Sequence, residues 1–468
     1  MMKKTAFLKL ISLVLALSFI LLSLAGCGII KPKLNTKLNG TSIDKYTIVY
    51  NPDALDYNLR AAEYIQSRIE ALGYAKLEIK KMSEGSFEHE IVVGETDRAI
   101  SSALNAEREG LEFSMLSDGN HVALEGDYFI IAAAAYYFVK TFVEDGAGDA
   151  VVPTEMLVRE PVVEEANNFI LLIGDGMGEA QTKLFDAYDV PTEGDTAYSD
   201  GEDFFYGYLF PYLGSSRTDS LDGTTDSAAG GTALASGYKT HNEYIGRDGN
   251  GNDVVTLTEL ACSIGKAAAV MSTEKNTGAT PASFSAHAND RDDSSDILKS
   301  LTENSQEHGF TVDCGYDYYT ANQLKIVENH ISNTLAKVDE NEKGFFLMYE
   351  EAHIDKHCHN NDADSTFEAI MRFNQAIGRF MEYAFYNPDT MVIITADHET
   401  GGLAINDGVC TYSSEDHTSA DVKIFAYGVG AEVFDGVTVE NTQISKTIAA
   451  FMGADSFGDP ATAPALTK

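Results

Sequence analysis

Residues 391–402 read Met391-Val-Ile-Ile-Thr-Ala-Asp397-His398-Glu-Thr-Gly-Gly402, an apolar, β-branched run that ends at a carboxylate beside an imidazole. Short apolar runs of this kind are typical of buried parallel strands. Ligands of open α/β sheets collect in the crevice outside the carboxyl ends of such strands. The stretch therefore predicts a buried strand whose tip places Asp397 and His398 in a functional site.

Two other apolar runs end in the same way. Asn168–Gly174 stops at Asp175, and Gly344–Glu350 continues into a segment of carboxylates and imidazoles that ends at His359. An Asp after a single strand is often only a turn or N-cap residue. Three such tips, with three histidines as nitrogen donors, instead predict that one sheet gathers them around metal ions.

Strands and helices alternate repeatedly across the second part of the chain. Further strands are predicted at Ala267–Met271 and Val422–Ala426, and helices at Asp296–Asn304, Asp317–Gln323 and Thr366–Tyr386. This alternation favours an α/β fold with a mostly parallel central sheet that helices cover on both faces. The predicted catalytic domain spans residues 166–468.

A smaller module, of α/β or α+β type, is predicted before this domain within residues 27–165. A polar tether near Lys31–Leu38 leads to strands at Tyr46–Tyr50, Glu90–Gly94 and His121–Leu124 and to helical segments at Leu59–Leu72 and Tyr128–Phe142. This order weakly resembles the non-catalytic N-terminal modules of some secreted glycosidases. Because the module has no cluster of catalytic residue types, we expect it to be dispensable for chemistry and to act in packing or spacing.

The beginning of the chain has the pattern of an export signal. The basic start, Met1-Met-Lys-Lys-Thr5, is followed by an apolar stretch and by Leu24-Ala-Gly-Cys27. This order is typical of a secretory signal peptide, and the tetrapeptide resembles a bacterial lipobox. The resemblance implies removal of residues 1–26, a lipid on Cys27 and anchoring to the outer face of the cytoplasmic membrane. An ordinary signal peptide or an uncleaved anchor is the alternative.

The chain is strongly acidic. Its 72 acidic and 33 basic residues give a formal net charge of −39. Such a charge argues against binding nucleic acid by neutralising its phosphates. It also opposes the steering of anionic substrates toward the protein. A site for phosphate must therefore supply its own local positive charge, as metal ions and one arginine would.

The cysteines after Cys27 are too sparse for a disulfide scaffold. They are Cys262, Cys314, Cys358 and Cys410, and the sequence does not choose among their three pairings. Cys358 lies beside His359, but the surrounding carboxylates and imidazoles favour a bystander role over that of a soft metal ligand.

A serine lies between the predicted strand tips, in Asp226-Ser227-Ala-Ala-Gly-Gly-Thr-Ala-Leu-Ala-Ser-Gly237. Ser227 follows turn residues and precedes a small-residue helical pattern. Its hydroxyl would then lie at a helix N-terminus, where backbone N–H groups favour an oxyanion or a phosphate. An N-cap serine is the ordinary alternative. No neighbouring general base is needed if a divalent cation activates the hydroxyl.

Five ordered motifs together resemble the alkaline phosphatase family. They are Gly174–Gly178, Asp226–Gly237, Ala279-Thr280-Pro281-Ala282 with Arg291, Glu350–His359, and Thr395–Gly402 with Asp416-His417, and they cover roughly residues 168–430. The resemblance implies that Ser227 is a nucleophile that becomes phosphoserine and that Arg291 binds two phosphate oxygens. On its own, Arg291 would more often form a surface salt bridge with a neighbouring aspartate, such as Asp290, Asp292 or Asp293.

The same resemblance implies two zinc ions and one magnesium ion per chain. Eight residues resemble the metal ligands: Asp355, His359 and His417 for one zinc, Asp397, His398 and Asp175 for the second, and Asp175, Thr280 and Glu350 for magnesium. Independently of the family, imidazole with carboxylate suits zinc, whereas a hydroxyl with two carboxylates suits magnesium. Two zinc ions roughly 4 Å apart can hold the attacking and leaving oxygens of a phosphoryl transfer.

Gly278 departs from the family pattern. Family members usually carry Asp or His at this position, two residues before the threonine of the Ala-Thr-Pro-Ala motif, in support of the magnesium shell. The sequence therefore predicts loosely held magnesium, which a Gly278→Asp substitution would tighten. Lys356, after Asp355, resembles a bacterial variant in which a lysine contacts phosphate through water.

The expected activity is the hydrolysis of small phosphate monoesters outside the cytoplasm. A phosphodiesterase or sulfatase-like hydrolase of the same superfamily is the nearest alternative, although the sulfatase formylglycine motif is absent around Ser227. A non-enzymatic glycan-binding lipoprotein is the alternative of another class, and the presence of every expected ligand argues against it. Whether the protein forms a homodimer, and whether the N-terminal module contacts cell-wall glycans, stays open.

Overall fold

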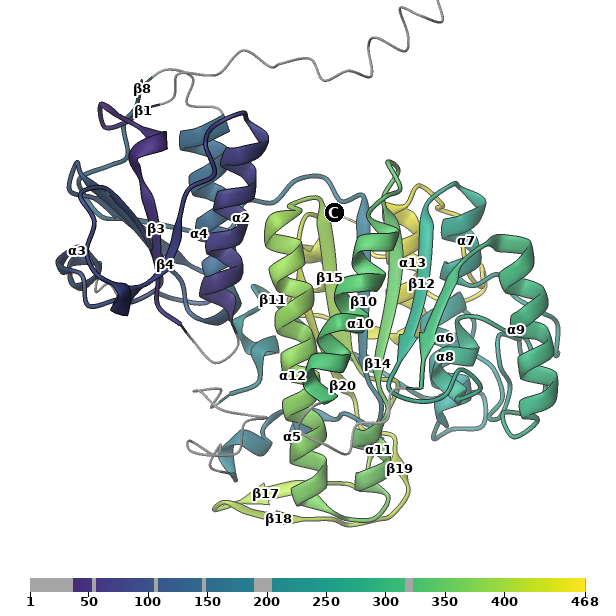
Figure 1. Ribbon diagram of the computed structural model, residues 1–468. Coiled ribbons are helices and arrows are strands. Elements are labelled where there is room, and N and C mark those ends of the chain that lie inside the picture. The colour runs from purple at the N-terminus through teal and green to yellow at the C-terminus, as the bar shows by residue number, and fades with distance from the viewer. Residues whose placement is uncertain are drawn as a thin grey trace, which may run out of the picture.

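A computed structural model describes residues 37–52, 56–104, 108–144, 149–188, 204–315 and 323–467. Two main sheets lie in different parts of the chain, the smaller one in the purple and blue part of Figure 1. The predicted signal peptide, Cys27 and most of the predicted tether lie outside the described residues. In the ranges that are described, no helix is both long enough and apolar enough to cross a membrane.

A six-stranded mixed sheet forms the centre of the N-terminal module. In spatial order its strands are β4 (Ile79–Lys81), β3 (Thr47–Tyr50), β5 (Glu90–Val93), β7 (His121–Glu125), β6 (Phe113–Ser117) and β9 (Leu157–Arg159). The helices of the module are α2 (Tyr57–Ala71), α3 (Ala99–Ala103) and α4 (Ile131–Phe138), with η3 (Tyr128–Ile130) before α4 and η4 (Val139–Glu144) after it. A second, small sheet contains β2 (Thr41–Ser42), β1 (Lys37–Leu38) and β8 (Asp149–Ala150).

An eight-stranded sheet forms the centre of the second domain. In spatial order its strands are β13 (Thr311–Cys314), β12 (Ala267–Ser272), β14 (Phe345–Glu351), β10 (Asn168–Gly174), β15 (Thr390–Thr395), β20 (Val422–Tyr427), β11 (Tyr212–Arg217) and β21 (Thr438–Glu440). Every neighbouring pair is parallel except the two pairs that β20 forms with β15 and β11. The predicted α/β fold with a mostly parallel sheet is confirmed.

Helices cover both faces of this sheet. They are α5 (Glu179–Thr182), α6 (Ser227–Ser236), α7 (Leu257–Ser263), α8 (Ala279–Ser283), α9 (Ser294–His308), α10 (Gln323–Val338), α11 (His353–Cys358), α12 (Ala363–Tyr386) and α13 (Asn441–Phe451). Alternate residues of a strand point to opposite faces. Ile170 and Leu172 of β10 therefore pack with α10 and α12, which lie in front of the strands in Figure 1. Phe169 and Leu171 pack with α6, α7 and α13 on the other face.

The second domain also contains two antiparallel sheets of two short strands each. β16 (Glu399–Thr400) pairs with β19 (His417–Thr418), and β17 (Ala404–Asn406) pairs with β18 (Val409–Thr411). The predicted helix Asp317–Gln323 lies outside the described residues except for Gln323, the first residue of α10.

The register of the central strands brings the predicted tips to one edge of the sheet. Ile173 of β10 pairs with Glu350 of β14 on one side and with Thr395 of β15 on the other. Ser272 at the end of β12 also pairs with Glu350. Four parallel strands therefore end at the same level, and the residues that follow them share one crevice.

The N-terminal module packs against the C-terminal half of α12. The ring of Phe129 stacks on Phe385 with centroids 5.8 Å apart and meets Tyr206 edge-on at 4.9 Å. Arg60 of α2 forms an ion pair of 2.8 Å with Glu382 of α12. One apolar cluster continues from the module into the second domain. The two parts therefore share a hydrophobic core.

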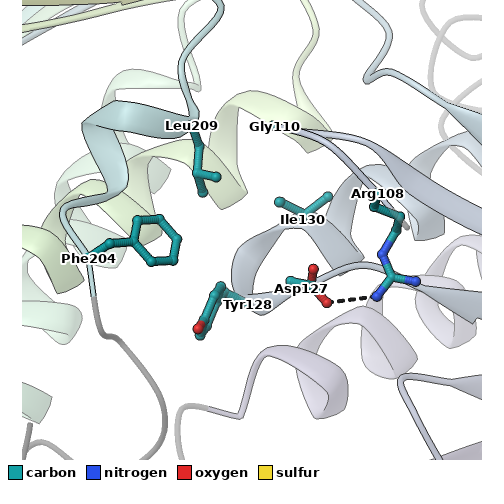
Figure 2. A pocket seen from close by; sticks show the side chains of 7 residues that line it. All are labelled: Arg108, Gly110, Asp127, Tyr128, Ile130, Phe204 and Leu209. Atoms are coloured by element: carbon teal, nitrogen blue, oxygen red, sulfur yellow. Dashed lines mark hydrogen bonds and ion pairs between the residues drawn. The ribbon is translucent and has the colours of Figure 1, made fainter. Parts of the chain in front are cut away.

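A cavity of about 390 Å³ opens at this junction (Figure 2). Arg108 and Asp127 of the module form an ion pair of 2.8 Å on its wall, and the rings of Tyr128 and Phe204 also line it. None of the predicted catalytic or metal-binding residues lines this cavity. It belongs to the contact between module and domain, apart from the strand tips.

Candidate active site

The buried carboxylates predicted from the sequence lie at the ends of neighbouring strands. Asp175 directly follows β10, Glu350 is the last but one residue of β14, and Asp397 lies two residues after the end of β15. The turn after β10 is tight because Gly176 has a φ of 72°. A Cβ atom at Gly176 would lie 2.8 Å from the Cα atom of Asp355 in α11. Only glycine fits this close approach with a positive φ.

Asp355, His359 and His417 form one group of side chains that could hold a metal ion. Nε2 of His359 lies 3.1 Å from Nε2 of His417 and 3.3 Å from Oδ2 of Asp355. The Nδ1 atoms of the two rings contact backbone carbonyls, that of Glu415 for His359 and that of Thr225, at 2.8 Å, for His417. Because each Nδ1 is bound to a carbonyl, each Nε2 is left to face a metal ion.

Asp175, Asp355 and His398 form a second such group. Nε2 of His398 lies 3.5 Å from Oδ1 of Asp175 and 3.3 Å from Oδ2 of Asp397. Both of these carboxylate oxygens are buried and lack a hydrogen-bond partner in the described residues. Asp355 therefore lies between the two groups, whereas the sequence assigned it to the first group alone.

Three of the clustered carboxyl groups have raised pKa values, whereas at Asp355 burial is outweighed by the hydrogen bonds of His359 and His417, which lower the pKa. Burial, and then the charges of Asp397 and Asp355, raises the pKa of Asp175 well above its usual value. Burial and Asp355 raise the pKa of Asp397 to about 7, and burial and Glu274 raise the pKa of Glu350 to about 8. Divalent cations would supply the missing positive charge and keep these groups ionised. The donor set therefore fits metal ions.

The predicted magnesium ligands offer a set of oxygens with no nitrogen among them. Oγ1 of Thr280, Oε1 of Glu350 and Oδ1 of Asp175 are all buried without a hydrogen-bond partner in the described residues. Thr280 comes from α8, whereas Glu350 and Asp175 come from strand ends. Hard oxygen donors of this kind suit magnesium.

Ser227 is the first residue of α6, and its hydroxyl is not used to cap the helix. Asp226 is the N-cap, and its Oδ1 accepts a hydrogen bond of 2.9 Å from the backbone N–H of Ala229. Ser227 is only 3% exposed, and its Oγ lies 3.2 Å from Nε2 of His398. The structure therefore places this hydroxyl beside the second ligand group, and the alternative of an N-cap serine is excluded.

The positively charged side chains of the site are held by carboxylates. Nη1 of Arg291 lies 3.2 Å from Oδ2 of Asp226, so its salt bridge is with an aspartate of a distant segment and not with Asp290, Asp292 or Asp293. Burial opposes the charge of Arg291, but Asp226, Asp175 and Asp355 raise its pKa. Lys356 pairs with Glu274 at 3.0 Å. Both cations lie in the region of the clustered carboxylates.

Thr400 is a residue of the site that the sequence interpretation missed. Its Oγ1 donates a hydrogen bond of 2.5 Å to Oδ1 of Asp355 and lies 3.2 Å from Nδ1 of His398. Since the hydroxyl proton goes to Asp355, the imidazole must donate from Nδ1, which leaves Nε2 unprotonated. The only signal in the sequence is that Thr400 follows Asp397-His398 by two residues.

The cysteines do not take part in the site. Cys262, Cys314, Cys358 and Cys410 are free thiols. Cys358 is buried, with its Sγ atom 3.7 Å from Nε2 of Gln181, and it belongs to neither ligand group. This placement agrees with the bystander role that the sequence favoured.

Known proteins share this combination of fold and residues. The family model described as alkaline phosphatase matches residues 166–326 and 321–412. Alkaline phosphatase 4 of Bacillus subtilis is 30% identical over 292 residues, which cover 52% of this chain and 63% of that protein. Alkaline phosphatase 3 of the same organism is 28% identical, with 60% of this chain and 71% of that protein covered.

A solved structure is similar as well. It is a variant of the alkaline phosphatase of the Antarctic bacterium TAB5 with magnesium bound in its M3 site, and it has a TM-score of 0.53 and 25% identity to this chain. The match covers 62% of this chain and 99% of the TAB5 chain. The match to the family model begins at residue 166, after the N-terminal module.

Proposed function

The chain belongs to the alkaline phosphatase family, and we propose that it hydrolyses phosphate monoesters through a phosphoserine intermediate at Ser227. One observation carries this proposal. The buried hydroxyl of Ser227, free of any capping role, lies beside a metal-ligand group, and the aspartate that caps its helix also holds Arg291. Nucleophile and phosphate-binding cation are thus positioned by the same residue, Asp226.

Three metal ions complete the proposed site. Asp355, His359 and His417 would hold one zinc, Asp175, Asp397 and His398 a second, and Asp175, Thr280 and Glu350 magnesium. When bound, these cations lower the pKa of the serine hydroxyl and stabilise the charge on the leaving oxygen. The formal charge of −39 makes this local positive charge necessary for a phosphate substrate.

The protein groups would then act on the phosphoryl group in turn. Arg291 and the N-terminal N–H groups of α6 bind the phosphoryl oxygens, which suits a helix N-terminus and a guanidinium. Oγ of Ser227 gives up its proton to water and forms a bond to phosphorus, while the bond from phosphorus to the ester oxygen breaks and that oxygen takes up a proton from water. Water then hydrolyses the phosphoserine, which releases inorganic phosphate and restores the serine hydroxyl. Oδ1 of Asp226 accepts from the backbone N–H of Ala229, and Oδ2 accepts from the backbone N–H of Glu243 and from Arg291, which holds the start of α6 and the guanidinium close together before substrate binds.

Activity on p-nitrophenyl phosphate with and without a chelator tests the proposal. We expect hydrolysis that a chelator abolishes, that zinc restores for the most part, and that zinc with magnesium restores fully. Dialysis without chelator is the control, and metal analysis should follow the loss and the return of activity. Preferential hydrolysis of a phosphodiester or a sulfate ester, or full activity after complete metal removal, would contradict the proposed function.

A conservative change of the phosphate-binding arginine gives a second test. Arg291→Lys keeps the charge but loses the planar pair of donors that matches two phosphate oxygens. We expect KM for p-nitrophenyl phosphate and the inhibition constant of inorganic phosphate to rise together by about 10- to 100-fold, since a charged hydrogen bond contributes about 1.5–3 kcal/mol. Steady-state kinetics and phosphate inhibition measure both quantities.

Arg217→Lys is a matched control for that change. Arg217 pairs with Glu440 at 3.0 Å on the protein surface, and its side chain is 53% exposed. We expect kinetics equal to those of the unaltered protein. An Arg291→Lys variant with unchanged phosphate inhibition would show that Arg291 does not bind the phosphoryl group.

A further inference from the structure

The space beside Gly278 is already filled by another side chain. A Cβ atom built at Gly278 would lie 2.5 Å from Oε2 of Glu274 and 2.6 Å from its carboxyl carbon. The Glu274 carboxylate therefore occupies the position at which a side chain of residue 278 would begin. The Glu274 side chain could not keep its present position if residue 278 carried an acidic side chain.

Glu274 is connected to the predicted magnesium ligands. Its backbone N–H donates a hydrogen bond of 2.8 Å to Oγ of Ser272, and the same hydroxyl donates to Oε2 of Glu350. Ser272 ends β12 and pairs with Glu350 of β14 in the sheet. The turn that carries Glu274 is therefore anchored on a carboxylate of the proposed magnesium site.

A second observation points to a cation at this place. Oγ1 of Thr280, Oε1 of Glu350 and Oδ1 of Asp175 are buried oxygens without a hydrogen-bond partner in the described part of the chain. Their side chains belong to residues that are 1%, 0% and 4% exposed. Buried polar atoms rarely stay without partners, so a bound ion with its water is the expected partner.

We propose that Glu274 supports magnesium at the oxygens of Asp175, Thr280 and Glu350, in place of the side chain that Gly278 lacks. Magnesium keeps several of its waters, so an acidic group beside its direct ligands strengthens binding by accepting hydrogen bonds from those waters. Oε1 of Glu274 lies 3.0 Å from Nζ of Lys356 and so also fixes this lysine, the residue after Asp355. This inference rests on the proposed function and names the residue that completes its magnesium site.

The proposal changes the expected effect of substitutions at position 278. From the sequence, Gly278→Asp tightens magnesium binding. With Glu274 in place, the new side chain must displace the existing carboxylate, so Gly278→Asp alone brings no gain. The same substitution becomes favourable when Glu274 is shortened, because the space is then free and the site has lost its acidic support.

Magnesium binding measured by calorimetry on the zinc-loaded protein, without substrate, tests this inference. We expect Glu274→Gln, which keeps the shape of the side chain, to weaken magnesium binding by at least about tenfold, as is usual for the loss of an outer-shell partner. Zinc content from metal analysis should stay unchanged. Glu274→Ala should weaken magnesium similarly, and Glu274→Ala with Gly278→Asp should restore most of the affinity.

Glu303→Gln, an exposed glutamate of α9, is the control for a general change in charge and should leave magnesium binding unchanged. Equal affinity in Glu274→Gln and the unaltered protein would overturn the proposal. So would the absence of magnesium binding in the unaltered protein, or the loss of zinc together with magnesium in Glu274→Gln. Because no substrate is present, magnesium binding through Glu274 in a protein without phosphatase activity would contradict the proposed function alone.

Discussion

Ser227→Ala should reduce the turnover of p-nitrophenyl phosphate by at least on the order of 10⁴-fold, since removal of a nucleophile costs this much in other covalent hydrolases. The substitution removes one oxygen, the buried Oγ that lies 3.2 Å from Nε2 of His398. Alanine fits α6 because Asp226 caps the helix and the serine hydroxyl does not. Zinc content and inhibition constants for phosphate should therefore stay close to those of the unaltered protein.

Ser236→Ala is the matched control on the same helix. Ser236 is the last residue of α6, is fully buried, and donates its hydroxyl to the carbonyl of Thr232 at 2.7 Å. Its loss should leave turnover unchanged. Rapid quenching with radiolabelled substrate should trap phosphoprotein in the unaltered protein and in Ser236→Ala, and none in Ser227→Ala. Turnover within tenfold of normal in Ser227→Ala would remove Ser227 from the role of nucleophile.

The strands that build the site could be predicted because each is a buried apolar run that stops at a carboxylate. Asn168–Gly174 and the run from Met391 are both strands of the central sheet, with bounds close to those expected. The rule that ligands collect outside the carboxyl ends of parallel strands then placed Asp175 and Asp397 at one edge. The pairing of Ile173 with Glu350 and Thr395 puts those ends at the same level.

Contacts between segments far apart in the sequence could not be predicted in this way. Taken alone, Arg291 would pair with a neighbouring aspartate, but its partner is Asp226, 65 residues earlier. Thr400 donates a hydrogen bond to Asp355, and Glu274 pairs with Lys356. Nothing in the local sequence of Thr400 or Glu274 indicates these partners. Such contacts depend on how turns at the sheet edge approach one another, which periodicity does not describe.

Helix α10 (Gln323–Val338) was not predicted from the sequence. Val327, Ile331, Leu335 and Val338 recur every three or four residues and face the core, which is the pattern of an amphipathic helix. The prediction of a helix at Asp317–Gln323 relied on a shorter stretch that the structure does not describe. The apolar repeat that extends along the whole of α10 is the stronger indication of a helix.

Removal of the N-terminal module, by a chain that begins near Glu165, should leave a catalytic domain that does not fold stably. The sequence presents the module as a spacer, but Phe129 and Tyr57 pack against α12 and an ion pair joins Arg60 to Glu382. Uncovering each large apolar side chain costs about 1.5–3 kcal/mol. These losses are comparable with the whole stability of a domain, about 5–15 kcal/mol.

A single glycine tests the same contact without deletion. Gly378 lies inside α12, and a Cβ atom there would overlap the hydroxyl oxygen of Tyr57 from the module. The Tyr57 ring cannot move away easily, because the guanidinium groups of Arg60 and Arg379 lie over it at 4.7 and 4.6 Å. In a helix free of such contacts, Gly378→Ala would stabilise the protein by about 1 kcal/mol. We expect the opposite sign, a loss of about 1–3 kcal/mol from overpacking.

Tyr57→Phe removes the overlapping oxygen and should rescue part of this loss. Denaturant unfolding of Gly378→Ala, Tyr57→Phe and the double variant measures the coupling between module and domain, with the double variant more stable than the sum of the single changes predicts. Turnover of the folded variants should stay normal, because every described ligand and Ser227 lie in the second domain. A Gly378→Ala protein more stable than the original would show that Tyr57 of the module does not pack closely against α12. A truncated chain would then be expected to fold and to keep its activity.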